Sequence, residues 1–438
     1  MLNTLNLRRF LLITSDIILL YFSLIVVVFW DFREKHFLKT LDEHLVPFSI
    51  LYFFWLIIFY IFGLYDLSLI RIKETFRARM PGALSTALIL GLIFFYLFPF
   101  FELTPKTNLV LNVLIFTVLQ YFWRKIFLTL FSSKFLTKIV IVGQAQKASE
   151  LAEEINARPH LGYRLIELKN DKDLMSQIKE QKIDTILVPP DLAFNSELIK
   201  NLYQCLPARV KFLDWTSAYE IITGKIPVLS INHIWFLQNL KGGKKIFYDM
   251  IKRALDVIWA GIIFILTMPI WLIIMILIKL EDGGPVIYTQ ERIGKDKRPF
   301  LLFKFRSMKP EAEKLTGPLW AEARDYRATK VGAILRKIHL DELPQMINAL
   351  KGEISLVGPR PERPEFVWQL EKEIPHYHLR HLIKPGFTGW AQLKFRYGRS
   401  IMDAKEKFQY DLYYIKNRSL FLDLGILLKT FQLFFKKE

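Results

Sequence analysis

The sequence predicts a membrane protein of mixed α-helical and α/β architecture. Three observations support this prediction: four long apolar runs near the N-terminus, short strands alternating with helices after them, and a mostly helical C-terminal part with one further apolar run. We therefore expect a four-helix transmembrane domain over residues 1–135, a small α/β module over 136–238 and a helical domain with a re-entrant membrane helix over 239–438.

The composition favours a membrane location. Hydrophobic residues make up 52% of the chain, and 37 of its 438 residues are phenylalanine, which is apolar for a soluble protein of this length. The net charge of +18 suits anionic lipid head groups, nucleic acid or phosphorylated ligands equally well. The single cysteine, Cys205, excludes an intrachain disulfide and a cysteine-rich metal site. The first apolar run is long and lacks a small-residue cleavage site, so we expect no cleavable signal peptide.

The four N-terminal apolar runs are each long enough to cross a bilayer core of about 30 Å. They cover Phe10–Trp30, Val46–Leu64, Pro81–Phe101 and Leu109–Phe131. Lys and Arg are more frequent before the first run, between the second and third, and around the end of the fourth than in the two other connections. By the positive-inside rule, the N-terminus and everything after Phe131 are expected in the cytoplasm.

After the fourth run, the pattern changes to short strands that alternate with helices. Residues 138–143 (KIVIVG), Thr185–Pro190 and Val210–Leu213 have the apolar character of buried strands, and Lys147–Ala157 has that of a helix. This alternation predicts a small α/β unit with a parallel sheet. Gly143 stands alone where a dinucleotide-binding fingerprint needs three spaced glycines, so we do not expect catalytic use of NAD.

A fifth apolar run, Val257–Leu280, has Pro269 near its centre. Proline inside a helix removes one hydrogen bond and clashes with the preceding turn, so a kink is expected there. Basic residues flank both ends of the run, which favours a cytoplasmic location for both ends. A helix near residues 252–280 that breaks at the proline and leaves by the leaflet it entered satisfies these observations, and a simple span is the alternative.

The clearest chemical pattern in the sequence begins at Asp341. Pro344 lacks a backbone N–H, so we expect a short helix to begin between Asp341 and Leu343 and to end at Gly352. Asp341 and Glu342 would then lie at the positive end of the helix dipole, which favours ionised carboxylates. Taken alone, such a pair is common and serves only to stabilise a helix.

Two arginines accompany these carboxylates. A short apolar strand, Ile354–Val357, leads into Gly-Pro-Arg-Pro, in which the prolines fix the backbone on both sides of Arg360. The planar guanidinium of Arg360 suits phosphate oxygens, and Arg336, which precedes Asp341, can converge on the same place. Two carboxylates between two arginines suit a phosphate ester and a metal ion.

The segment HLDELPQMINALKGEISLVGPRPERPEF, residues 339–366, resembles the signature of the bacterial sugar transferases. These are monotopic phosphoglycosyl transferases that move a sugar 1-phosphate from a nucleotide sugar to polyprenyl phosphate. Further segments match in family order: Gly284–Gly294, Lys304–Met308, Lys384–Gly398 and Asp411–Leu424. The resemblance runs from about Lys252 to the C-terminus. It implies a Rossmann-like module with a regulatory or structural role at 136–238 and a catalytic domain with a re-entrant helix at 239–438.

We expect a two-step phosphoryl transfer. Asp341 would attack the sugar-side phosphate of a UDP-sugar, UMP would leave, and undecaprenyl phosphate would take the phosphosugar from the aspartyl intermediate. Positive charge would come from Arg336, Arg360 and a Mg²⁺ ion, for which Asp341 and Glu342 are enough as ligands. Glu342 would hold this ion or help to activate the acceptor. The protein would then be a hexose phosphotransferase, of galactose or glucose type, at the first membrane step of capsule, exopolysaccharide or O-antigen synthesis.

Further polar residues are candidates for phosphate binding. Arg292, Lys304 and Arg306 stand among aromatic and apolar neighbours. They fit either an amphipathic surface helix whose basic stems lie along the membrane or ligands for the phosphates of the donor or acceptor. The resemblance places Gln392, in a turn-rich loop, near the nucleotide. Leu420–Phe435 is apolar with few charges and is expected to lie on the membrane as a helix.

The histidines near the carboxylate pair do not indicate a metal site. His376 and His378 alternate as in a strand, where Glu373 would lie on the opposite face, so we do not expect zinc. His339 stands where the resembled family usually has serine. Histidine weakens the cap that serine would give the helix, but it leaves the two carboxylates in place.

The expected partners are a UDP-sugar, undecaprenyl phosphate and membrane lipid, without nucleic acid, and long members of the family are thought to form homodimers. The expected location is the bacterial inner membrane, with several spans and a cytoplasmic catalytic domain.

Two other function classes stay open. One is a polytopic transporter with a cytoplasmic regulatory tail, which would line a path with ionisable residues, although Asp16 is among the few in the four runs. The other is a non-catalytic scaffold that binds anionic lipid.

Overall fold

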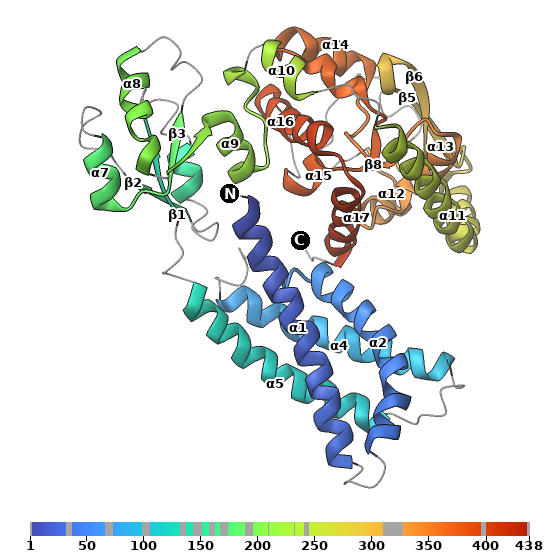
Figure 1. Cartoon of the computed structure of the whole chain (residues 1–438). Helices are drawn as coiled ribbons and strands as arrows, with labels where there is room; N and C mark the ends of the chain where they lie inside the picture. Colours follow the sequence, from blue (N-terminus) through green and yellow to red (C-terminus); the bar gives the residue numbers. More distant parts are fainter. Residues whose placement is uncertain are drawn as a thin grey trace. The chain divides into compact units, whose positions relative to one another are not determined.

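The computed structural model describes residues 2–31, 37–65, 73–98, 106–131, 137–142, 151–156, 163–166, 174–188, 196–208, 210–231, 233–240, 245–309, 327–395 and 400–435. The chain divides into two compact units, Met1–Thr223 and Gly224–Glu438. Figure 1 shows the helices and strands of both units.

The N-terminal unit begins with long helices: α1 (Leu2–Asp31), α2 (Phe37–Ile61), α4 (Lys73–Leu97) and α5 (Lys106–Phe131). Each contains a stretch long and apolar enough to cross a membrane: Arg9–Trp30, Phe37–Ile61, Arg79–Leu97 and Thr107–Phe127. These stretches agree with the four apolar runs of the sequence. The second begins earlier than the expected Val46, because α2 continues through Pro47.

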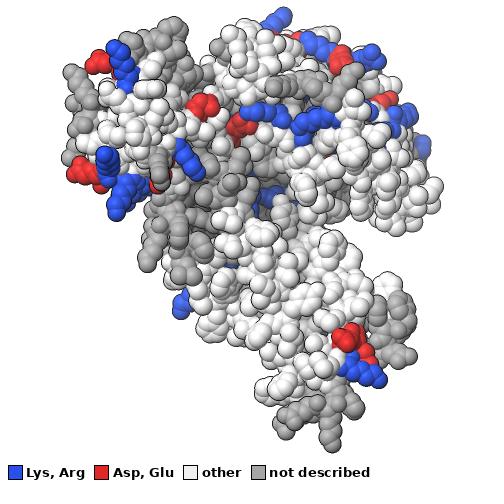
Figure 2. All heavy atoms as spheres, viewed as in Figure 1, with Lys and Arg blue, Asp and Glu red and all other residues white. Residues whose placement is uncertain are grey.

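These helices pack in a closed ring in which α1 and α4 each contact α2 and α5. Large side chains such as Phe48 and Trp55 fill the space between them, and the rings of Phe59 and Phe116 stack with centroids 5.6 Å apart. The outward side chains are apolar, as Phe10 illustrates, and Figure 2 shows an almost uncharged surface over the visible face of these helices. An apolar exterior around a packed core is what lipid-facing helices require.

Buried polar side chains link α5 to α1 and α2. Arg124 on α5 donates to the carboxylate of Asp16 on α1 at 2.7 Å, and Gln120 donates to the same carboxylate at 3.2 Å. Two further buried polar pairs join these helices: Asn112 with Ser23, and Asn108 with His44. The sequence suggests that ionisable groups are rare in these runs, and the structure shows that Asp16 is neutralised by Arg124 inside the helix group. Such pairs hold membrane helices in register.

Asp16→Asn is expected to lower the stability of the N-terminal unit. The change removes the charge that buried Arg124 faces, and breaking one partner of a buried ion pair costs roughly 3–5 kcal/mol. Thermal unfolding of the full-length protein in detergent measures the effect. Asp42→Asn, on an exposed position of α2, makes the same chemical change and should leave the unfolding midpoint unaltered. Equal midpoints for both variants would show that the buried pair does not stabilise the helices.

A parallel sheet follows these helices in the N-terminal unit. Its strands are β1 (Thr137–Ile141), β2 (Tyr163–Ile166), β3 (Thr185–Val188) and β4 (Lys211–Asp214), in the order β2-β1-β3-β4. The helices around it are residues 151–156, α7 (Leu174–Gln181), α8 (Ser196–Gln204) and α9 (Trp215–Thr223), with a short 3-10 helix, η5 (Leu206–Ala208). Residues 151–156 and α9 cover one face, and α7 and α8 cover the other. The predicted parallel α/β module is confirmed.

Strand β2 has no counterpart among the predicted strands. It is only four residues long and carries a charged Arg164, so its apolar pattern is weak. Its place in the sheet depends on pairing with β1, from Thr137 opposite Tyr163 to Val140 opposite Ile166. Gly143 and the expected helix start at Lys147 lie outside the described residues.

The described residues of the C-terminal unit are mostly helical and form two small sheets. Its helices are α10 (His233–Asn239), α11 (Ile246–Asp282), α12 (Lys330–Lys337), α13 (Gln345–Lys351), α14 (Pro364–Glu373), α15 (Trp390–Lys394), α16 (Ile401–Asn417) and α17 (Leu420–Phe435). Short 3-10 helices are η6 (Val228–Ser230), η7 (Lys295–Lys297), η8 (Leu340–Glu342) and η9 (Tyr377–Leu382). Strands β5 (Ile287–Ile293) and β6 (Pro299–Phe305) form an antiparallel hairpin, and β7 (Ser355–Val357) pairs in parallel with β8 (Gly386–Thr388). Helix α17 has the predicted bounds.

This unit begins at Gly224, before the expected domain start at residue 239. The backbone N–H of Ile226 donates to the carbonyl of Gln409 at 3.1 Å, and Lys225 pairs with Glu406 at 2.6 Å. Both partners lie on α16, so residues just after Gly224 contact the C-terminal helices. The expected domain boundaries stay predictions.

The β5–β6 hairpin overturns the amphipathic-helix interpretation of the basic residues around it. Arg292 on β5 lies opposite Phe300, and Lys304 on β6 lies opposite Tyr288. Side chains of a strand alternate between two faces, so Gln290, Arg292 and Lys304 share one face of the hairpin. Arg306 follows the last residue of β6.

The segment around His376 is not a strand. His376 has a left-handed backbone, with φ of 64°, and the next residues form η9. Pro375 precedes it and ends α14, which turns the chain before the 3-10 helix begins. The ring of His376 packs against His233 and Phe236, with centroids 4.8 and 4.5 Å away.

Helix α11 is continuous over 37 residues, and Pro269 does not end it. The helix is long and apolar enough to cross a membrane. Near its N-terminal end, Arg253 donates to the last carbonyls of α13 at 2.7 and 2.6 Å. At its C-terminal end, Glu281 accepts from the first backbone N–H of α12 at 2.6 Å, and Asp282 pairs with Arg306. Both ends of α11 therefore contact other elements of the C-terminal unit.

Candidate active site

The predicted carboxylate pair lies between α12 and α13. His339 follows α12 with a left-handed backbone, φ 56°, and η8 comes next. Helix α13 begins at Gln345, later than the expected start at Asp341–Leu343. The cause is local, because left-handed His339 redirects the chain and Pro344 has no N–H for the regular helical hydrogen bonds. The predicted end is confirmed, since Gly352 caps α13 with φ 84°.

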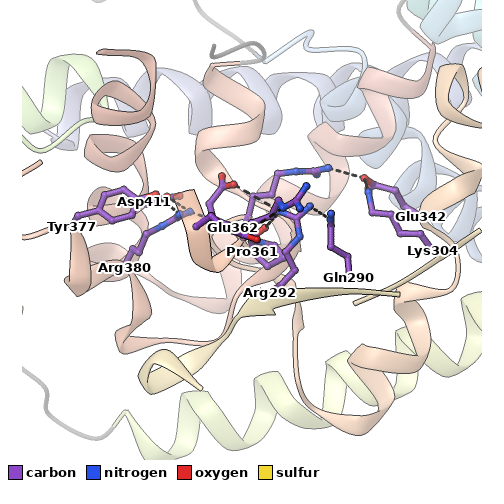
Figure 3. Close-up of polar contacts among 12 residues, drawn as sticks. Gln290, Arg292, Lys304, Glu342, Pro361, Glu362, Tyr377, Arg380 and Asp411 are labelled. Atoms are coloured by element: carbon purple, nitrogen blue, oxygen red, sulfur yellow. Dashed lines mark hydrogen bonds and ion pairs between the residues drawn. The ribbon is translucent and has the colours of Figure 1, made fainter. Parts of the chain in front are cut away.

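Glu342 lies between two cations. Its Oε1 accepts hydrogen bonds from Arg360 Nη2 at 2.7 Å and from Lys304 Nζ at 3.1 Å, and Figure 3 shows Lys304 beside it. Burial alone would raise the pKa of Glu342, but the guanidinium and the ammonium outweigh burial and hold that pKa well below its ordinary value. Glu342 is therefore ionised at neutral pH and compensates two positive charges from β6 and the loop after β7.

Asp341 is also buried, with 6% of its surface exposed, but its surroundings differ. Its carboxylate accepts no hydrogen bond from any residue in the described part of the chain. Burial raises the pKa of Asp341 and the charge of Glu342 adds to that, whereas Lys304 and, more weakly, Arg336 lower it; burial prevails. A buried carboxylate that accepts no hydrogen bond from the described residues is costly to the fold, so Asp341 is a candidate functional residue. The two carboxylates have pKa shifts of opposite direction, which is typical of groups with different roles.

Arg360 stands in the proline-rich loop after β7, and 47% of its side chain is exposed. A small hollow lies beside it. The hollow is lined by Arg292, Leu302, Lys304, Gln345, Arg360, Pro361 and Gly386. Three of these side chains are cationic and come from β5, β6 and the loop, so the hollow suits an anionic group such as phosphate.

Asn348 fixes α13 against the hairpin. Its Oδ1 accepts from the backbone N–H of Phe303 at 3.0 Å, and its Nδ2 donates to the carbonyl of Leu301 at 2.7 Å. Asn348 is completely buried. Because Lys304 is on β6 and Glu342 precedes α13, these bonds set the spacing between the two side chains. Asn348 was not among the residues predicted from the sequence, although a polar residue between apolar neighbours on a short helix is a signal for such a role.

Three predicted phosphate-binding residues have other partners. Arg292 donates to the carbonyl of Pro361 at 3.0 Å while it lines the hollow, and burial lowers the pKa of Arg292 to about 10. Arg306 pairs with Asp282, so it anchors the end of α11 and lies outside the residues that line the hollow. Gln392 donates to a carbonyl of β8 at 3.3 Å, and its buried Oε1 has no hydrogen-bond partner among the described residues. A role in phosphate binding stays a prediction for all three.

The carboxylate pair has the chemistry that magnesium needs. Mg²⁺ prefers oxygen ligands and keeps several waters, so one or two carboxylates are enough. Glu342 accepts the hydrogen bonds of both cations at Oε1, which leaves Oε2 for a ligand, and the carboxylate of Asp341 accepts none from the described residues. Within the described ranges, no group of three or more His, Cys, Asp or Glu gathers, so richer ligand sets are not formed there. Asp341 and Glu342 are the residues that could hold Mg²⁺.

Comparisons with known proteins find sequences similar to this chain. A family model described as bacterial sugar transferase matches residues 247–437. The chain is 39% identical over 262 residues to the UDP-N-acetylgalactosamine-undecaprenyl-phosphate N-acetylgalactosaminephosphotransferase of Aeromonas hydrophila, over 59% of this chain and 60% of that protein. It is 31% identical over 318 residues to the UDP-glucose:undecaprenyl-phosphate glucose-1-phosphate transferase of Escherichia coli (strain K12), over 67% of this chain and 66% of that protein.

A third relative is shorter. The "Uncharacterized sugar transferase EpsL" of Bacillus subtilis (strain 168) is 40% identical over 182 residues, which are 41% of this chain and 85% of that protein. The matches with the two longer relatives span less than two thirds of their length. The family model matches the unit that contains the carboxylate pair, Arg360 and the hollow.

Proposed function

The chain belongs to the bacterial sugar transferase family, and we propose that it transfers a sugar 1-phosphate from a UDP-sugar to undecaprenyl phosphate and releases UMP. The observation that carries this proposal is the pair of buried carboxylates beside a hollow lined by three cations: one carboxylate is bonded by two cations, and the other accepts no hydrogen bond from the described residues. Relatives with undecaprenyl-phosphate sugar phosphotransferase names support it.

In the proposed reaction, a carboxylate oxygen of Asp341 attacks the sugar-side phosphorus of the donor. The bond from this phosphorus to the bridging oxygen breaks, and UMP leaves with the electron pair. A phosphate oxygen of undecaprenyl phosphate then attacks the same phosphorus, which releases the Asp341 carboxylate and forms undecaprenyl diphosphate sugar. Asp341 suits the first step because its carboxylate is not engaged in hydrogen bonds to the described residues.

The other charged side chains would stabilise the phosphates. Arg360 and Lys304 are held in place by Glu342 before any ligand arrives, so they need little reorganisation when charge develops on the phosphoryl oxygens. Arg336 adds positive charge near Asp341. A Mg²⁺ ion held by Asp341 and Glu342 would supply further positive charge to the diphosphate.

The acceptor is a lipid phosphate, so the site must lie at the membrane surface. The exposed side chains of α11 are apolar over most of its length, as Leu266, Leu272 and Leu280 illustrate. One end of α11 is bonded to α13 and the other to α12 of the same unit. We therefore propose that α11 enters and leaves by the cytoplasmic leaflet and does not cross the inner membrane. The N-terminal helices would cross it.

Labelling of single cysteines is expected to place both ends of α11 on the cytoplasmic side. Cys205→Ser gives a cysteine-free background, to which Met250→Cys or Glu291→Cys is added at an exposed position on either side of the apolar stretch. An impermeant maleimide should label neither in intact spheroplasts and both after permeabilisation. Lys35→Cys, in a connection expected outside, is the positive control. Labelling of Glu291→Cys in intact spheroplasts would favour a simple span.

The proposed reaction is tested by measuring UMP release from purified protein with undecaprenyl phosphate and Mg²⁺. The donors would be UDP-N-acetylgalactosamine, UDP-glucose, UDP-galactose and UDP-N-acetylglucosamine, since the relatives' names differ in the sugar. Release that needs lipid and metal would establish the reaction and identify the sugar. No release from any donor, by protein that binds anionic vesicles, would favour a non-catalytic scaffold.

A further inference from the structure

The loop that presents Arg360 is held by its carbonyl groups. Four successive carbonyls, of Pro359, Arg360, Pro361 and Glu362, accept hydrogen bonds of 2.8 to 3.0 Å from other elements. Two of these donors are backbone N–H groups, and the other two are the guanidinium groups of Arg380 and Arg292. The loop therefore depends on side chains far away in sequence for its conformation.

The hydrogen bond to the Arg360 carbonyl fixes the peptide group that follows Arg360. Prolines on both sides of Arg360 restrict its backbone, but they have no N–H donor and so do not bond the loop to the fold. Arg380 Nη2 donates to this carbonyl at 2.9 Å and so fixes the peptide that follows Arg360. The direction of the Arg360 side chain toward Glu342 depends on that peptide.

Arg380 is itself held on two other sides. Its Nη1 donates to the hydroxyl of Tyr377 at 2.6 Å, and its Nη2 also lies 3.1 Å from Asp411 Oδ2 on α16. Figure 3 shows Tyr377, Arg380 and Asp411 together at one side of the contacts and Glu342 with Lys304 at the other. Arg380 and Asp411 are 5% and 3% exposed. A buried ion pair seldom stabilises a protein more than apolar residues of the same volume would. The Arg380–Asp411 pair is therefore expected to have a role other than packing.

We propose that Arg380, oriented by Asp411, is a positioning residue for Arg360. An ion pair that only joined η9 to α16 would not need the third bond, to the Arg360 carbonyl. The inference rests on the proposed function for its effect on activity, but the positioning itself is a property of the loop and can be measured without substrates.

Hydrogen exchange of the full-length protein in detergent measures the positioning directly. In Arg380→Lys, one ammonium cannot reproduce the fork that reaches Tyr377, Asp411 and the carbonyl. Peptides covering residues 357–363 should exchange about tenfold faster in Arg380→Lys and in the milder Asp411→Asn than in wild type. Glu406→Gln changes a half-exposed carboxylate on the same helix, paired with Lys225, and should leave this peptide unchanged. Wild-type exchange of the peptide in both Arg380→Lys and Asp411→Asn would overturn the inference.

A double-mutant cycle on kcat/KM tests the consequence for the reaction. Arg380→Lys alone is expected to lower kcat/KM about 10- to 100-fold, as the loss of a supporting residue does. In an Arg360→Lys background, the same change should lower it no more than about threefold, because the group it positions is already altered. Effects that multiply would show that Arg380 acts independently of Arg360 and would contradict the inference. A wild-type protein that releases no UMP would remove the proposed function, while the exchange measurement would still decide on the positioning.

Discussion

Asp341→Asn is expected to abolish UMP release and to leave the protein folded. Loss of a nucleophile costs on the order of 10⁴-fold or more in kcat. Burial raises the pKa of Asp341 above its ordinary 3.8, so keeping this carboxyl ionised at neutral pH lowers the stability of the folded state. Asparagine has nearly the same shape and no charge. The unfolding midpoint without Mg²⁺ should therefore be equal to or higher than that of wild type.

Exchange of labelled UMP into the UDP-sugar isolates the first half of this reaction, because it needs the aspartyl intermediate and no lipid acceptor. The wild type should catalyse the exchange, and Asp341→Asn should not. Asp249→Asn makes the same change at a half-exposed carboxylate that pairs with Arg418, and it should behave as wild type. Undiminished exchange in Asp341→Asn would be consistent with the proposed reaction but would exclude Asp341 as its nucleophile.

The parts of the site that could be predicted from sequence are those determined by neighbours in the chain. Pro344 and Gly352 delimit α13, and the prolines around Arg360 constrain its backbone wherever the loop lies. Adjacent carboxylates remain adjacent in any fold. The start of α13 was less predictable, because it depends on the left-handed backbone of His339, which a non-glycine residue seldom adopts.

Contacts between distant segments account for what the sequence could not predict. Arg380 reaches the carbonyl of Arg360 only because η9 packs against α16, and Arg306 meets Asp282 only because the end of α11 packs beside α12. For Arg124, the rotation of α5 turns a residue near a helix end toward Asp16. Such partners depend on how helices pack, which local patterns do not contain.

The β5–β6 hairpin is a different case, because its strands lack a clear alternation of polar and apolar residues. Thr289, Gln290, Glu291 and Arg292 are consecutive polar residues on β5, and Lys304 is the one charged residue of the otherwise apolar β6. Without a period of two, basic and aromatic residues beside a membrane also suit a surface helix. The pairing of Arg292 with Phe300 and of Lys304 with Tyr288 settles the matter in favour of strands.

Glu342→Gln is expected to lower both activity and stability. Glutamine cannot compensate the charges of Arg360 and Lys304, and it is a poorer ligand for Mg²⁺. We expect kcat to fall on the order of 100-fold or more, and the Mg²⁺ concentration for half-maximal UMP release to rise. The free energy of unfolding should fall by about 1–3 kcal/mol, a modest range because 47% of the Arg360 side chain is exposed and solvent screens its charge.

The loss of stability in Glu342→Gln is expected to depend on pH, because Glu342, unlike Asp341, has a lowered pKa. The pKa of Glu342 is lowered in the folded state, so its stabilisation is complete above its ordinary pKa of 4.5 and disappears as the pH falls further. The stability difference between wild type and Glu342→Gln should therefore be constant near neutral pH and shrink below about pH 4.5. Glu365→Gln, a half-exposed carboxylate on α14, should show no such difference. Equal stability of Glu342→Gln and wild type at neutral pH would contradict the pairing, because two cations beside a neutral side chain must repel one another.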